Sequence, residues 1–247
     1  MQRPPRDEAK VRADLAAAYR MAALEGWDDT IYTHLSASVP GEPGRYLINP
    51  FGALFEEITA SSLVKVDVQG RVVDGSGAKV NPSGFAIHGA VHAARPEVEC
   101  VIHLHSPWGV ALAMLPGGLQ STSQWAMRLH GRLGRHAYEG LALGAEEQQR
   151  LVRRLGMLDG LILDHHGPLV VGRTVAEAWI LMSMLEKAAR AQLRAMGAFG
   201  GGLRGVPDDV AELTRRQWVG DGSEWDGDAE WPALLRRLDR LAPGYRD

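Results

Sequence analysis

Cysteine is almost absent from this sequence, and its scarcity sets a first limit. The 247 residues include one cysteine, Cys100, so no disulfide can form within the chain. This content fits a reducing compartment. Cys100 lies in an apolar segment, which favours a small buried side chain over a reactive thiol.

Long apolar runs and an excess of positive charge are also missing. No apolar run approaches the roughly 18 residues of a membrane span, and residues 1–7 contain no apolar stretch typical of a signal peptide. The net charge of -3 gives no basic footprint for nucleic acid. The sequence therefore predicts a cytoplasmic protein that binds neither membranes nor nucleic acid.

Helical and strand patterns alternate along the chain, which is typical of an α/β domain. The hydrophobic content of 45% is enough for a sizeable core. Helices are predicted at residues 8–25, 83–94, 106–115, 145–156 and 175–195, and strands near 35–39, 46–48, 63–68, 72–73, 99–104 and 159–164.

The domain organisation follows from one glycine-rich segment. Five glycines fall within residues 197–205, which predicts a flexible break after a single domain at residues 8–196. The remainder, 197–247, is expected to be a linker and a helical tail. Its tryptophans, Trp218, Trp225 and Trp231, are expected to pack on the body or on a neighbouring subunit.

Two histidines end an apolar segment and form the most informative motif. In an extended strand alternate side chains share a face, so His103 and His105 can aim at one point while Leu104 faces the core. A second apolar strand ends in His165 and His166, and we favour His166 as a third member of the group. Three neutral imidazoles make a Zn²⁺-type or Fe²⁺-type site with an open position. A His-x-His pair alone is more often an ordinary core or surface feature. The metal-site interpretation is supported by the position of both motifs at strand ends, where open α/β sheets bind their ligands.

Several motifs together resemble the class II aldolase/adducin family over roughly residues 10–195. They are Gly26–Trp27, Leu47–Gly52, Thr59–Asp67, Asn81–His88, Ala94–Val98, Val101–Pro107, Asp164–Gly167 and Gly172–Ala178. The resemblance implies a single three-layer α/β/α domain with a central, mostly antiparallel or mixed sheet. It also implies that His103, His105 and His166 hold a divalent metal. Zinc is the first choice, with iron or manganese as alternatives.

One departure from the family concerns its acid/base residue. The sugar-phosphate aldolases carry a glutamate where this chain has Gly84, and glycine cannot move a proton. The local sequence is more similar to the adducin branch, whose head domains are regarded as non-catalytic. His88, one helical turn after Gly84, is a candidate proton carrier, and a packed helix histidine is the alternative.

The family's phosphate contacts are also changed. The matching positions are His34, Phe51, Gly52, Pro82 and Ser83, and of these only Gly52 and Ser83 keep the family's residue types. We expect His34, Phe51, Gly52 and Ser83 to contact substrate. Because hydroxyl donors are lost, the substrate is expected to be a carboxylate or aromatic compound without phosphate.

The function that these features favour is a metal-dependent carbon–carbon lyase, with aldol cleavage and decarboxylation both open. Decarboxylation needs less of a general base, because it makes an anion without abstracting a carbon-bound proton. The alternatives are a non-haem iron oxygenase and an adducin-like binding module without catalysis. By resemblance, the chain is expected to form a homotetramer.

Overall fold

The computed structural model describes residues 7–140, 144–200, 202–219 and 227–247, and only the backbone of residues 82–85, 145 and 219. Within these residues, seven strands form one sheet in the order β3-β2-β1-β4-β7-β6-β5. The strands are β1 (His34–Ser38), β2 (Arg45–Ile48), β3 (Val64–Asp67), β4 (Cys100–His103), β5 (Leu133–His136), β6 (Gly160–Leu163) and β7 (Gly167–Gly172). Neighbouring strands are antiparallel except for β5 and β6, which are parallel, so the sheet is mixed.

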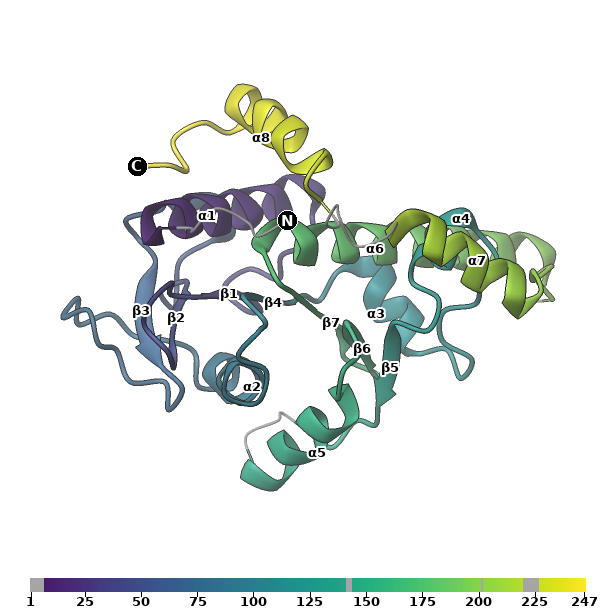
Figure 1. Ribbon diagram of the computed structural model, residues 1–247, viewed down its shortest axis with the longest axis horizontal. Coiled ribbons are helices and arrows are strands. Elements are labelled where there is room, and N and C mark those ends of the chain that lie inside the picture. Colours follow the sequence, from purple (N-terminus) through teal and green to yellow (C-terminus); the bar gives the residue numbers. More distant parts are fainter. Residues whose placement is uncertain (1–6, 141–143, 201, 220–226) are drawn as a thin grey trace.

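Helices cover both faces of this sheet (Figure 1). One face carries α1 (Glu8–Glu25), α3 (Pro107–Ala113) and α6 (Val175–Phe199), and the other carries α2 (Pro82–Ala94) and α5 (Ala145–Leu155). The short elements η1 (Phe55–Glu57), α4 (Gln124–Arg128), α7 (Asp208–Val219) and α8 (Glu230–Leu241) complete the chain. The predicted three-layer α/β/α architecture with a mixed sheet is confirmed.

Helix α1 begins and ends where its sequence predicts. The Asp7 carboxylate accepts a hydrogen bond from the Lys10 amide at 2.8 Å, which satisfies a free N–H group of the first turn. Gly26 ends the helix in the left-handed conformation with φ 67°, which costs little for glycine. The helix buries Val11, Leu15 and Tyr19 against the sheet.

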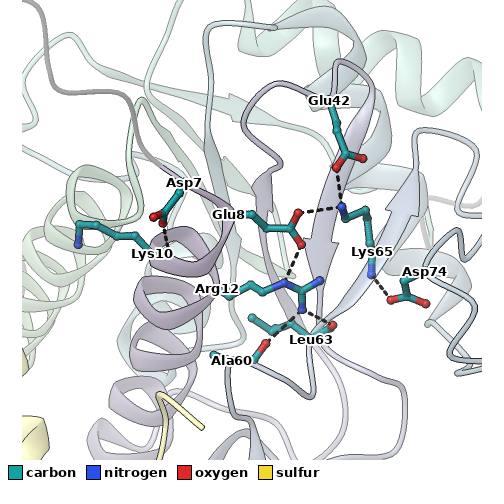
Figure 2. Close-up of polar contacts among 9 residues, drawn as sticks. All are labelled: Asp7, Glu8, Lys10, Arg12, Glu42, Ala60, Leu63, Lys65 and Asp74. Carbon is teal, nitrogen blue, oxygen red and sulfur yellow. Dashed lines mark hydrogen bonds and ion pairs between the residues drawn. The ribbon is translucent and has the colours of Figure 1, made fainter.

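An ionic cluster attaches α1 to the edge strand β3 (Figure 2). The Lys65 ammonium contacts Glu8 at 2.8 Å and Glu42 at 2.6 Å. The Arg12 guanidinium pairs with Glu8 and donates to the backbone oxygens of Ala60 and Leu63. These contacts orient the helix, while the buried apolar face supplies most of the stabilisation.

Five elements are absent from the sequence-based prediction: η1, β5, β7, α4 and α7. Strand β7 contains Pro168, and proline argues against a central strand because it has no N–H to donate. Here Pro168 lies opposite Ile162, and both neighbouring strands still pair with β7. The strand predicted at residues 72–73 is reduced to one bridge between Val66 and Val72.

The C-terminal segment packs on the helical layer that contains α1. Helix α6 continues through Gly197 to Phe199 and ends at Gly200 with φ 71°, so the helix passes the expected boundary at residue 196. Trp231 of α8 is buried, and its indole N–H donates to Asp14 at 3.0 Å. Trp218 remains 45% exposed, and Trp225 lies outside the described residues. No helix in the described part of the chain has the length and apolar character required to cross a bilayer.

Candidate metal centre

Three histidines converge at one end of the central strands of the sheet. His103 ends β4, His105 follows in the next loop, and His166 lies in the three-residue turn between β6 and β7. The nearest ring nitrogens of the three histidines all lie within 4.8 Å of one another. The Nε2 atoms of His103 and His166 are 3.2 Å apart. This group, His103, His105 and His166, is called the histidine triad below.

Hydrogen bonds outside the triad fix the tautomers of two of its rings. His103 Nδ1 lies 3.0 Å from the Pro168 carbonyl oxygen, and His105 Nδ1 lies 2.8 Å from a carboxylate oxygen of Asp29. Both oxygens are acceptors, so each Nδ1 donates a proton. The lone pairs of His103 and His105 therefore lie on Nε2, and that of His103 faces His166. This is the arrangement of metal-binding histidines with a carbonyl or carboxylate partner.

The surroundings of His103 and His166 favour uncharged imidazoles. Burial lowers the pKa of His166 to about 4, and the neighbouring His105 adds to this shift. Burial lowers the pKa of His103 well below its usual range, with contributions from His166, His105 and His34. At neutral pH these rings therefore keep their lone pairs, as metal binding requires.

Two backbone features place His166 in the triad. His165 has φ 58°, a left-handed conformation that is uncommon for a residue with a side chain. Gly167 follows, and a Cβ atom there would lie 2.6 Å from the backbone oxygen of Leu104. Glycine thus lets the β6–β7 turn approach the segment that joins His103 to His105.

A cavity of about 540 Å³ opens beside the triad. Its lining residues are Asp28, Asp29, His105, Pro107, Val110, Tyr138, Gly140, His165 and His166. The Tyr138 ring is 6.4 Å from the His166 ring and is 52% exposed, so its phenol is accessible to a small molecule. Among the described lining residues there is no lysine or arginine, whereas two are aspartates.

His34 and His88 lie in the interior behind the triad rather than in this cavity. His34 pairs with His103 across β1 and β4, and its ring is 5.7 Å from the ring of His88. His88 Nδ1 is 2.7 Å from Ser36 Oγ, and Ser36 Oγ is also 2.8 Å from His92 Nε2. His92 Nδ1 lies 3.0 Å from Ser38 Oγ. We call Ser38, His92, Ser36 and His88 the serine–histidine row.

The structure does not bring all the expected substrate residues together. Phe51 and Gly52 follow β2 in an exposed turn, and neither is among the described residues that line the cavity. Ser83 and Gly84 belong to the first turn of α2, but their side-chain positions lie outside the described part of the structure. The substrate roles of His34, Phe51, Gly52 and Ser83 remain predictions.

Sequence analysis missed three contributors to this site: Asp29, Tyr138 and the carbonyl of Pro168. Asp29 stands 76 positions from its partner His105, and no spacing rule connects them. The available signal was chemical, because a histidine that binds metal usually donates its other N–H to a carboxylate or carbonyl. A search for acidic loop residues would have included Asp29.

Comparison with known proteins identifies the family. The family model described as "Class II Aldolase and Adducin N-terminal domain" matches residues 13–193. The chain belongs to the class II aldolase and adducin family. Class II aldolases generally depend on a divalent metal, and the triad offers the donors that such an ion binds.

Members of this family with both aldolase and adducin names are similar to the chain. The structure of an aldolase II superfamily protein from Pseudomonas syringae is 43% identical with a TM-score of 0.93, covering 99% of this chain and 98% of that one. L-fuculose 1-phosphate aldolase from Glaciozyma antarctica PI12 is 30% identical with a TM-score of 0.86, covering 99% and 97%. Alpha-adducin from Rattus norvegicus is 38% identical over 97% of this chain but only 34% of its own length.

Proposed function

We propose that this protein is a divalent-metal-dependent carbon–carbon lyase, of aldolase or decarboxylase type, acting on a small non-phosphorylated carboxylate or carbonyl compound. One observation carries the proposal: the Nε2 lone pairs of His103 and His105 lie beside His166, at the edge of a cavity. This arrangement offers three imidazole ligands and leaves room for substrate.

Each residue near the triad has a role in this proposal. His103, His105 and His166 would hold the ion, and Asp29 would orient His105 and increase its basicity. A bound divalent ion, zinc by preference, would polarise a substrate carbonyl and stabilise the negative charge that develops on its oxygen. The accessible phenol of Tyr138 is placed to donate a hydrogen bond or a proton to a bound substrate.

The charge of the cavity supports a substrate without phosphate. Asp28 and Asp29 would repel a phosphate dianion, and no described lining residue is a lysine or arginine. The name of the Glaciozyma relative points instead to a sugar 1-phosphate. Such compounds therefore belong in the substrate test, and we expect them to be cleaved poorly or not at all.

The test is an assay of the metal-loaded protein against β-keto acids, ortho-hydroxy aromatic acids and ketose 1-phosphates, with carbon dioxide and aldehyde release as readouts. We expect turnover that disappears in the His103→Ala, His105→Ala double variant. Full stoichiometric metal in that variant would reject the site. Rapid cleavage of a ketose 1-phosphate would retain the lyase but reject the proposed substrate class, and oxygen uptake with bound iron would favour an oxygenase.

A second candidate is a non-catalytic adducin-like module. It is favoured by the similarity to alpha-adducin and by Gly84, which removes the carboxylate that the family's sugar-phosphate aldolases carry there. Metal analysis separates the two candidates. A purified protein that takes up no divalent ion, even after incubation with zinc, manganese or iron, would support the module.

A further inference from the structure

A second cavity, of about 390 Å³, lies between the helices of the α1 layer. No residue of the histidine triad lines it. Its walls come from α1, α3, α6 and α8 and from Trp27, which lies just after α1. We call this space the tryptophan cavity.

Aromatic side chains give the cavity its name. Trp27 and Trp179 stack on each other with their ring centres 5.1 Å apart, and both are almost fully buried. Trp108 is half-buried and lies beside them on the lining. None of these three indole N–H groups donates a hydrogen bond within the described residues.

The charged residues of the cavity leave an excess of positive charge. Glu25 is neutralised by Arg237 at 2.7 Å. Lys187 and Arg190 form no ion pair in the part of the chain that the structure describes. Burial raises the pKa of the Glu186 carboxyl, although the hydrogen bond from the Gly109 amide and the charge of Arg190 oppose the rise, so this acid offsets the cations only in part.

We propose that the tryptophan cavity binds a small aromatic carboxylate. The ring of such a ligand would contact the indole walls, and its carboxylate would accept hydrogen bonds from Lys187, Arg190 or an indole N–H. The site stands independently of the proposed lyase function, because none of its groups is a predicted metal ligand. It adjoins the cavity of the triad, since Pro107 lines both spaces.

The test is calorimetric titration of the full chain, freed of metal by a chelator, with benzoate. Working without metal excludes binding of the carboxylate to an ion in the triad. We expect benzoate to bind and to change the tryptophan emission, while benzyl alcohol and acetate, which each lack one half of the recognised chemistry, bind much more weakly. Lys187→Gln should weaken benzoate binding by about tenfold, the usual effect of removing a charge-assisted hydrogen bond.

The matched control is Lys79→Gln, because Lys79 is an exposed lysine outside this cavity. It should leave benzoate affinity unchanged. Trp108→Leu should weaken both benzoate and benzyl alcohol, and Arg190→Gln, at an exposed position, replaces Lys187→Gln if that variant does not fold. Absence of benzoate binding, equal binding of acetate, or equal weakening by the Lys79 and Lys187 variants would overturn the proposal.

Discussion

Asp29 is the residue outside the triad on which the proposed metal affinity most depends. It accepts the Nδ1 proton of His105 and so keeps the lone pair of that ring on Nε2. We expect Asp29→Ala to weaken zinc binding by about 10- to 100-fold, as loss of such partners does in other metal sites. Competition with a chromophoric chelator measures the affinity.

Asp28→Ala is the control for this change, because Asp28 lines the same cavity without contacting a triad ring in the described structure. It should retain nearly the full affinity. Equal losses in the two variants would mean that the general negative charge of the cavity, rather than the orientation of His105, determines zinc affinity.

The triad itself makes a direct prediction. Replacement of His103, His105 or His166 by alanine should remove most of the bound metal, because two imidazoles hold a divalent ion far less tightly than three. Metal content per chain after gel filtration measures this. His130→Ala is the control, since His130 bonds to Ser121 away from the triad. Normal metal content in all three triad variants would reject the site.

At the scale of elements, Gly167 controls how closely strand β7 approaches the end of β4. An added Cβ would meet the backbone oxygen of Leu104 at 2.6 Å, so the β6–β7 turn would have to move. We expect Gly167→Ala to lower the free energy of unfolding by about 1–3 kcal/mol, the usual cost of overpacking. It should also weaken metal binding, since His166 precedes this residue.

Gly197→Ala provides the matched control within a helix. Gly197 lies inside α6, and an added Cβ there would meet nothing within 4 Å. Alanine should therefore stabilise the protein by about 0.5–1 kcal/mol. Urea unfolding midpoints of both variants test the pair, and a Gly167→Ala protein as stable as Gly197→Ala would contradict the steric argument.

At the scale of the whole molecule, buried histidines make stability depend on pH. Burial lowers the pKa of His34 and of His92 to about 4 and lowers that of His88 well below its usual range, whereas unfolded histidines titrate near 6.5. The unfolded state therefore binds more protons below about pH 6.5, and the free energy of unfolding falls as the pH decreases toward 4. The slope is up to about 1.4 kcal/mol per pH unit for each histidine.

Urea midpoints of the metal-free protein between pH 7 and 4.5 measure this slope. His92→Gln should reduce it by the contribution of one histidine, whatever the variant's stability at pH 7. A slope that is unchanged in this variant would show that His92 is protonated in the folded protein.

The proposed assembly is a homotetramer. Trp218, Phe199 and Leu213 leave 45%, 79% and 53% of their surface exposed on the isolated chain, and a repeated contact through one such surface can close a ring. Light scattering at micromolar concentration should give four times the chain mass of 26.8 kDa. A mass of one chain would count against the assembly.

The sequence predicted the features that depend on local chemistry. The bounds of α1 follow from apolar spacing and from Gly26, and the triad follows from histidines at the ends of apolar segments. Features that depend on distant contacts were not predictable. Pro168 is acceptable in a central strand because, in its position opposite Ile162, it does not prevent the neighbouring strands from pairing with β7. Asp29 contacts His105 only after the chain has folded.

The serine–histidine row has a direction, and a single carbonyl sets it. Ser38 Oγ donates to the Val98 carbonyl oxygen at 3.2 Å, so it must accept the Nδ1 proton of His92. His92 Nε2 then accepts from Ser36, and Ser36 accepts from His88 Nδ1. His88 Nε2 is left as a bare acceptor that has no partner among the described residues. The tautomer of His88, next to His34, is thus determined by a hydrogen bond at the far end of strand β1. The order of donors and acceptors along the row carries this effect through the interior, and the backbone does not have to move.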